Sequence, residues 1–225
     1  QGSTLTIYCE TAEQPVGWDS AWNKQQLFYP ISHNRLPVVW DYRRNDIADD
    51  GNIYTTINGL RYVIKDNAAV VAKQPINIIT AIIPAEINYK DATYNVTSIA
   101  DSAFEGCSDL ATITIPEGVT SIGSDAFSGC SGLAAVTIPA SVTSIDNGAF
   151  SGCSNLVAIT IPASVTRIGS YAFSNCSSLT KIDVAEGNPV YHSEGNCVIE
   201  TVTETLIAGC KNSKIPSDGS VTCIS

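Results

Sequence analysis

Eight cysteines are the side chains most open to a chemical role in this sequence. Four of them recur at intervals of 23 residues: Cys107, Cys130, Cys153 and Cys176. If these residues stack at the strand spacing of about 4.8 Å, their Cβ atoms lie beyond the roughly 3.5–4.5 Å that a disulfide requires. We therefore expect buried free thiols. A zinc site is not predicted, because the sequence has no paired C-x-x-C motif and no cysteine–histidine cluster.

The other cysteines lie near the C-terminal end of the sequence or in its first residues. A two-residue turn at 203–204 would place Cys197 opposite Cys210 in a hairpin, within disulfide range if the two residues form a non-hydrogen-bonded pair. The sequence leaves two alternatives, a disulfide or two free thiols. Cys223 takes the place that Ser121 and Ser144 hold in the repeats described below, so we expect its thiol to be exposed, and either reactive or simply unpaired.

Catalytic side chains are scarce. The two histidines, His33 and His192, lie in no motif, and the chain lacks the G-x-S-x-G, H-E-x-x-H, Walker and dinucleotide-binding patterns. Isolated acids such as Glu105, Asp125 and Asp146 fit solvated loops better than the paired carboxylates of a glycosidase. We therefore predict that the chain is not an enzyme.

Charge and hydropathy exclude further classes of partner. The formal charge is −10, from 22 acidic and 12 basic residues, so phosphate backbones and anionic lipid headgroups would repel the chain. No apolar stretch approaches the roughly 20 residues that span a bilayer, so direct membrane insertion is not expected. Residues 46–51 lack the D-x-D-x-D-G spacing and the terminal glutamate of a calcium loop. The sequence predicts no cofactor and no nucleic-acid partner.

The central part of the sequence consists of four copies of a 23-residue repeat, and the copies share residue types at equivalent positions. The copies begin at Val96, Val119, Val142 and Val165. If each copy makes one turn of a coil, which we call a rung, equivalent side chains lie above one another and form internal columns. One rung cannot bury its own apolar edge, so its stability must come from its neighbours. The predicted phenylalanine column consists of Phe104, Phe127, Phe150 and Phe173.

Each rung contains two extended segments joined by a short turn. In the first rung Ile113 and Ile115 alternate with threonines, which predicts a strand with its isoleucines facing inward. The V-T-S-I segment at 119–122 predicts a second, shorter strand of the next rung. The intervening A-F-x-x-C segment is too short for a stable helix, and we expect it to form a tight helical turn.

These residues resemble the BspA-like class of leucine-rich repeats of bacterial surface proteins. The resemblance rests on the L-x-x-I-x-I-P strand, the V-x-x-I-x-x-x-A-F segment and the 23-residue length, and it covers residues 96–187. It implies a right-handed leucine-rich-repeat solenoid, mostly β with short helical turns. It also implies an extracellular or cell-surface protein used for adhesion or for recognition of proteins and other ligands.

Less regular segments flank the four repeats. Residues 45–95 are rich in strand signals, among them a hairpin turn at Asn58-Gly59 and an apolar run at 76–83, and we interpret them as a β-rich N-terminal cap. Residues 188–225 predict a C-terminal β-hairpin insertion and the start of a further repeat. Residues 1–44 are similar to the end of an upstream repeat followed by the tryptophan-rich spacers of the same family.

Two groups of residues are candidates for binding a protein or glycan ligand. The first comprises outward positions of the predicted strands: Thr112, Thr114, Thr137, Thr160, Lys181 and Asp183. The second comprises aromatic residues of the spacer: Trp18, Trp22, Trp40 and Tyr42. For both groups a structural role is an open alternative, because threonine columns also pack side to side and aromatic residues also seal solenoid ends. The chain as a whole is accordingly either a ligand-binding module or a spacer that holds another domain away from the cell.

Overall fold

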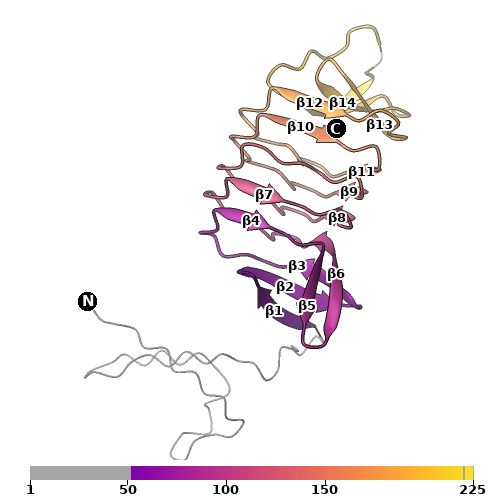
Figure 1. Cartoon of the computed structure of the whole chain (residues 1–225). Helices are drawn as coiled ribbons and strands as arrows, with labels where there is room; N and C mark the ends of the chain where they lie inside the picture. The colour runs from indigo at the N-terminus through magenta and orange to yellow at the C-terminus, as the bar shows by residue number, and fades with distance from the viewer. Residues whose placement is uncertain (1–51, 220, 225) are drawn as a thin grey trace, which may run out of the picture. The chain divides into compact units, whose positions relative to one another are not determined.

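The computed structural model describes residues 52–219 and 221–224, and this part of the chain consists of strands and turns without a helix (Figure 1). The predictions on residues 1–44, including Trp18, Trp22, Trp40 and Tyr42, lie outside the described residues. The strands in chain order are β1 (Ile53–Ile57), β2 (Leu60–Lys65), β3 (Ala68–Val71), β4 (Thr80–Ile82), β5 (Glu86–Tyr89), β6 (Ala92–Ile99), β7 (Thr112–Thr114), β8 (Ser121–Ile122), β9 (Ser144–Ile145), β10 (Ala158–Ile161), β11 (Arg167–Ile168), β12 (Lys181–Val184), β13 (Tyr191–Glu194), β14 (Cys197–Glu200), β15 (Thr205–Gly209) and β16 (Cys223–Ile224).

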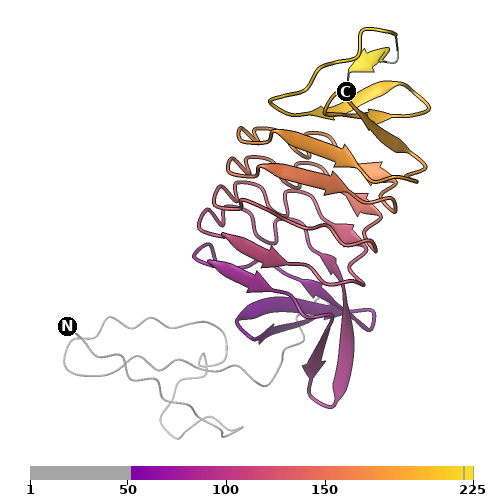
Figure 2. The same ribbon diagram turned by 45° about the horizontal axis from the view of Figure 1, so that its top comes forward.

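The repeats form a stack of rungs, as Figures 1 and 2 show from two directions. On one side, the V-T-x-I segments pair in parallel and in register from β6 through β8 and β9 to β11. Residues exactly one repeat apart are partners: Ile99 pairs with Ile122, and Ile122 with Ile145. Because the register equals the repeat length, every rung places the same side chain at the same point.

The longer strands stack on a second side of the coil. Here β4 pairs in parallel with β7, and β10 with β12. Residues 134–138 continue this column between β7 and β10 without a regular ladder, and the Val157 N–H donates to the Ala134 carbonyl (3.2 Å). The alternation predicted from the sequence is confirmed, because Thr112 and Thr114 are exposed while Ile115 and Ile138 are buried.

The core between the two sides is built from the predicted columns. Successive phenylalanine rings lie parallel, with centroids 5.2, 5.1 and 5.8 Å apart from Phe104 to Phe173. The leucine and cysteine columns are buried beside them. Full burial of a large apolar side chain contributes roughly 1.5–3 kcal/mol, so the stacked columns are the main source of stability. The prediction that equivalent side chains pile up directly is confirmed.

The prediction of short helical turns is wrong. In the segment after β8, N–H groups alternate between two kinds of partner. Ala126 and Ser128 donate within the turn, to Gly123 and Asp125, whereas Phe127 donates to Ala149 of the next rung (2.7 Å). Left-handed φ angles at every fourth residue, such as Asp125 (φ 54) and Gly129 (φ 73), produce this alternation. A helix would need all of these N–H groups for itself, so stacking against the next rung excludes it.

Residues 52–95 combine a hairpin with a path that follows the rungs. β1 and β2 form the hairpin predicted at Asn58-Gly59, whose φ angles of 51 and 79 suit a two-residue turn. β3 then pairs in parallel with β6, and β4 with β7, so residues 68–83 run alongside the first regular rung. β5 forms a second hairpin with β6. The role of this segment as a cap stays a prediction.

After β12 the chain leaves the regular path. β14 and β15 pair antiparallel, as expected of two hairpin arms, but β13 and β16 join them in a four-stranded sheet. The Tyr191 hydroxyl accepts the Ile168 N–H (3.0 Å), so a side chain takes the place of a further V-T-x-I strand above β11. β16 resumes parallel pairing against β15.

Candidate binding surface

The outward side chains of β4, β7, residues 134–138, β10 and β12 form one surface, which we call the strand face. The structure brings all six predicted strand positions together here. Thr112, Thr114, Thr137, Thr160 and Lys181 are exposed, and Asp183 is half-buried. Their shared position follows directly from the period of two along each strand and the register of the rungs.

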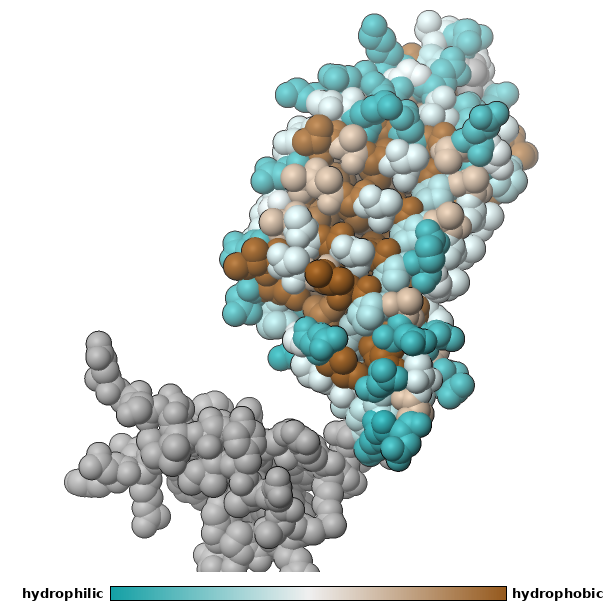
Figure 3. All heavy atoms as spheres, viewed as in Figure 1, coloured by the Kyte–Doolittle hydropathy of each residue, from teal (hydrophilic) through white to brown (hydrophobic). Residues whose placement is uncertain are grey.

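The strand face carries no charge over most of its length. From β4 to β10 its outward residues are Thr80, Ile82, Thr112, Thr114, Ala135, Thr137, Ala158 and Thr160. Figure 3 shows this surface as apolar and weakly polar atoms in the middle of the rungs, with hydrophilic side chains along the margins. The first charges appear on β12, where Lys181 and Asp183 form an ion pair (2.6 Å). Such an exposed pair contributes little to stability. It marks the boundary of the uncharged part of the strand face.

Three exposed isoleucines in or just before β4 were not predicted as binding residues. Ile76, Ile79 and Ile82 are exposed by 68%, 63% and 69%. The sequence shows them within an apolar run that has no clear alternation, and such a run conceals which members face solvent. Of the three, Ile82 lines a groove of about 550 Å³, whose other lining residues are Asn58, Gly59, Leu60, Ile78, Thr80 and Pro84. The hairpin turn between β1 and β2 thus forms one wall of a concave, largely apolar area.

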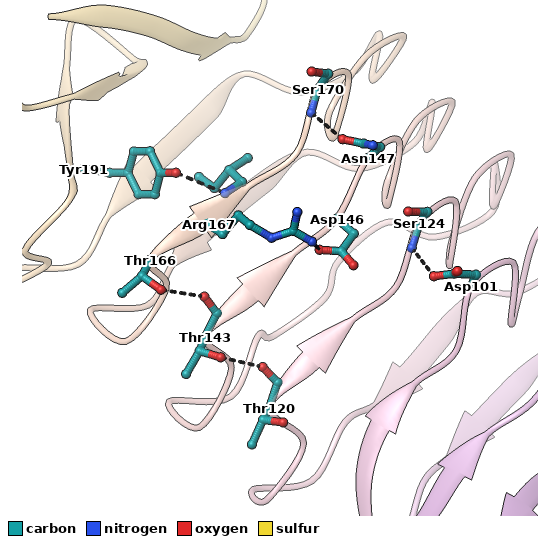
Figure 4. A network of polar contacts seen from close by, with 11 residues as sticks. Asp101, Thr120, Ser124, Thr143, Asp146, Asn147, Thr166, Arg167, Ser170 and Tyr191 are labelled. Carbon is teal, nitrogen blue, oxygen red and sulfur yellow. Dashed lines mark hydrogen bonds and ion pairs between the residues drawn. The ribbon is translucent and has the colours of Figure 1, made fainter. Parts of the chain in front are cut away.

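A separate polar network follows the V-T-x-I side (Figure 4). Threonine hydroxyls donate to the threonine carbonyl one rung earlier, from Thr143 to Thr120 (3.1 Å) and from Thr166 to Thr143 (3.4 Å). Next to them, the guanidinium of Arg167 forms an ion pair with Asp146. These contacts join rungs to one another and leave their outer atoms at the surface.

Aspartate and asparagine cap the turns beside this network. The Asp101 carboxylate accepts the Ser124 N–H (2.7 Å), and the Asn147 side-chain oxygen accepts the Ser170 N–H (2.9 Å). Each cap lies against a glycine of the next rung, Gly123 or Gly169, where an added Cβ would come within 2.6 Å of side-chain and backbone atoms. The caps therefore alternate along the stack, on every second rung.

Comparison with known proteins places this architecture in a family. The family described as "BspA type Leucine rich repeat region" matches residues 85–221 in six copies, which is more than half of the 225 residues. The chain belongs to the BspA-type leucine-rich repeat family. The six copies extend beyond the four regular repeats on both sides, since they include part of residues 45–95 and most of residues 188–225. No curated protein is a significant match.

Two solved structures support the same fold, and a third is similar in sequence over part of the chain. A leucine-rich repeat protein from Bacteroides capillosus is 28% identical, with a TM-score of 0.54 over 59% of this chain and 98% of that protein. The pneumococcal vaccine antigen PcpA is 20% identical, with a TM-score of 0.50 over 72% of this chain and 57% of PcpA. A protein from Bacteroides ovatus is 33% identical over 58% of this chain and 40% of that protein, with a TM-score of 0.48. The chain thus spans only about half the length of the last two proteins.

In these BspA-type repeats the cysteine column is a set of internal hydrogen-bond donors. The thiols of Cys130, Cys153 and Cys176 donate to the phenylalanine carbonyl of the preceding rung, over 3.1–3.2 Å. Burial raises the pKa of Cys130 to about 12 and that of Cys176 to about 11, and it raises the pKa of Cys153 further. Protonated, buried thiols are neither nucleophiles nor metal ligands at neutral pH, so this column is structural, as predicted.

Of the two alternatives for Cys197 and Cys210, the structure has two free thiols. Cys197 lies opposite Gly209, because four residues rather than two separate the arms and the one-residue register shift between Val198 and Ile199 offsets only part of the difference. Both thiols are free, with Cys197 buried and Cys210 half-buried. The loop between the arms is also longer than the two-residue turn predicted at 203–204, since β14 ends at Glu200 and β15 begins at Thr205. Cys223 is exposed and free, as expected.

No other constellation in the described residues offers chemistry. His192 lies next to the Thr201 hydroxyl (3.0 Å) without an acid or nucleophile arranged around it as a triad. Within residues 52–219 and 221–224, no group of three or more His, Cys, Asp or Glu side chains is placed to hold a metal ion. A bilayer-spanning helix is likewise absent from this part of the chain. The surfaces of the BspA-type rungs are therefore the features that remain for function.

Proposed function

We propose that this chain is a non-enzymatic recognition module whose strand face binds a protein at the cell surface or outside the cell. One observation carries the proposal. The strand face is uncharged from β4 to β10 and includes Ile82, which is exposed by 69%, while Ile79, directly before β4, is exposed by 63%. Soluble proteins rarely expose a contiguous apolar area of this kind unless another molecule covers it.

The chemistry of the strand face suits a polypeptide partner. Protein interfaces combine an apolar centre with a polar rim, and charged residues are depleted at the centre. Here Ile82 lines the groove at the apolar end and Ile79 lies directly before β4, while the threonines offer hydroxyls for hydrogen bonds. Lys181 and Asp183 form part of the rim. Nucleic acid, cofactors and direct membrane insertion have no place in this proposal.

The proposed location rests on the family. The chain belongs to the BspA-type family, whose repeats are similar to those of bacterial surface proteins. The pneumococcal relative is described as a vaccine antigen, which is consistent with an exposed location of that protein. We extend this location to the present chain, together with a role in adhesion. Trp18 and Trp22 remain proposed as additional anchors for a ligand.

A spacer role is the second candidate function. Its support is the uniformity of the first three rungs, which differ little on the strand face. A spacer needs a rigid stack with unremarkable surfaces, whereas a receptor needs residues whose replacement removes binding. The two functions therefore differ in a measurable way.

The experiment titrates the chain against a panel of purified extracellular-matrix and plasma proteins by biolayer interferometry. The test variant carries Ile79→Asp and Ile82→Asp, which place two charges at the centre of the apolar area. The matched control is Val202→Asp, since Val202 is 87% exposed but lies outside the strand face. Loss of binding by at least about 10-fold in the test variant alone supports the proposal. Absence of any bound protein, or equal binding by both variants, favours the spacer.

A further inference from the structure

The fourth rung carries an aromatic side chain where the other rungs have small or acidic ones. Tyr171 is exposed by 80%, and its φ angle is 58. The equivalent residues are Ser102, Asp125 and Gly148, with φ angles of 55, 54 and 62. This position therefore requires a left-handed backbone in every rung.

A bulky side chain is unfavourable in this conformation, because its Cβ crowds the adjacent peptide. Glycine, which the third rung has at this point, avoids the strain. Packing does not compensate Tyr171, since most of its surface is in solvent. Residues in a strained backbone conformation whose side chains are not buried are concentrated at functional sites. Tyr171 is thus the residue of this rung whose presence the fold does not explain.

The surroundings of Tyr171 are polar and hydrogen-bonding. Four residues before it lies Arg167, which replaces the serines of earlier rungs and pairs with Asp146. Immediately next to Tyr171, the Ser170 N–H donates to the side-chain oxygen of Asn147, and Figure 4 shows this pair near Arg167 and Asp146. The pair of Arg167 and Asp146 is partly exposed, so its outer atoms can reach a ligand.

Two backbone donors of this corner have no partner in the part of the chain that the structure describes. In the third rung, the N–H groups of Gly148 and Gly152 donate to the carbonyls of Ser170 and Ser174. The equivalent N–H groups of the fourth rung belong to Tyr171 and Asn175. Neither has a hydrogen-bond partner among residues 52–219 and 221–224, because no further A-F-x-x-C turn follows the fourth rung. Both residues are exposed.

We infer that the fourth-rung corner at Tyr171, with the ion pair of Arg167 and Asp146 on the strands before it, binds a carbohydrate. A sugar ring presents an apolar C–H face, which stacks on an exposed aromatic ring, and a periphery of hydroxyl groups. Guanidinium, carboxylate and amide groups together donate to and accept from such hydroxyls. Tyr171 offers the aromatic ring, and Arg167, four residues earlier, and Asp146, one rung earlier, offer the charged groups.

A protein partner fits this corner less well. Aromatic anchors in protein interfaces lie at the centre of apolar areas that exclude water. The neighbours of Tyr171 along the chain and in the adjacent rung are Ser170, Gly148 and Asn147, which form no such area. The inference is independent of the protein-binding strand face, which lies on a different side of the rung.

The test uses the full chain on a printed array of neutral and acidic oligosaccharides, followed by calorimetric titration with the strongest binder. Tyr171→Gly should weaken binding by at least 10-fold while the melting temperature stays the same or rises, because glycine relieves the left-handed strain. Asp125→Gly is the matched control, a change to glycine in the same column two rungs earlier, and it should leave binding unchanged. Arg167→Ala should weaken binding without abolishing the fold.

Three results would overturn the inference. One is a wild-type chain that binds no oligosaccharide on the array. Another is unchanged affinity of Tyr171→Gly, and the third is an equal loss in Asp125→Gly. The double variant of Ile79 and Ile82 should retain the glycan, so failure of the strand face and failure of this corner are distinguishable. If Tyr171→Gly instead loses only a protein ligand, the corner is a protein site and the carbohydrate assignment is wrong.

Discussion

The Cys153 thiol donates a hydrogen bond to the Phe127 carbonyl of the preceding rung, over 3.2 Å. The same carbonyl accepts the Cys130 N–H (3.1 Å), so one oxygen joins a turn of its own rung to the next. The relationship repeats along the column, which makes the thiol a polar contact inside an otherwise apolar core.

Replacement of Cys153 by alanine should destabilise the chain by about 1–3 kcal/mol, because it removes this donor and leaves a small cavity. Urea unfolding monitored by circular dichroism measures the change in the free energy of unfolding. Cys223→Ala, at an exposed thiol, should stay within about 0.5 kcal/mol. Equal effects of the two replacements would contradict a structural role for the column.

Alkaline pH should lower stability through the same column. Burial raises the pKa of Cys130 from 9.0 to about 12 in the folded chain, whereas in the unfolded chain the thiol keeps its ordinary value. The raised pKa means that the contribution is complete below about pH 9 and is lost as the pH rises toward 12. Denaturant unfolding between pH 8 and 11 should show this decline, and it should be smaller in Cys130→Ala. A decline identical in the two proteins would assign it to other groups.

Loss of one stacked ring should be among the most damaging single changes. Phe150 is fully buried, with ring neighbours at 5.1 and 5.8 Å on its two sides. We expect Phe150→Ala to cost about 3–5 kcal/mol and to lower the melting temperature strongly. Val202→Ala, at an exposed site, is the control. A shift of only a degree or two for Phe150→Ala, measured by calorimetry, would be incompatible with the stacked core.

The capped turns should not tolerate a methyl group at Gly123. Its Cβ would lie 2.5 Å from the Asp101 carboxylate oxygen and 2.6 Å from the Asp101 backbone nitrogen. Backbone cannot move away without breaking the stack, so Gly123→Ala should destabilise by about 1–3 kcal/mol. Asp146→Ala, in the equivalent column where a side chain is already accommodated, should cost less than about 1 kcal/mol. Thermal unfolding that ranks the two variants in the opposite order would refute the close approach.

The free thiols of Cys197 and Cys210 can be checked chemically. Both peptides should take up an alkylating reagent in denaturant to the same extent with and without prior reduction, because the register places Cys197 opposite Gly209. Mass spectrometry of the digested chain gives the answer. A peptide pair that gains two hydrogens only after reduction would restore the disulfide.

The sequence alone determined the repeat architecture of this chain. A period of 23 residues, an alternation of Ile113 and Ile115 with threonines, and columns of phenylalanine, leucine and cysteine were sufficient to predict stacked rungs and the residues of the core. These features are local or strictly periodic, and a strict period leaves each side chain only one place in the stack. The hairpin turn at Asn58-Gly59 was predictable for a related reason, since its left-handed residues are encoded in the turn itself.

Only the tertiary structure decided the features that depend on a partner across the stack. The A-F-x-x-C segment forms no helix, because the Phe127 N–H bonds to the next rung rather than to its own turn. Ile82 faces solvent because β4 pairs in register with β7, a fact that an unbroken apolar run cannot express. The four-residue loop between β14 and β15 leaves Cys197 opposite Gly209 rather than Cys210. In each case a hydrogen-bonded neighbouring segment decides the local structure, and the local residue pattern does not predict where that segment lies.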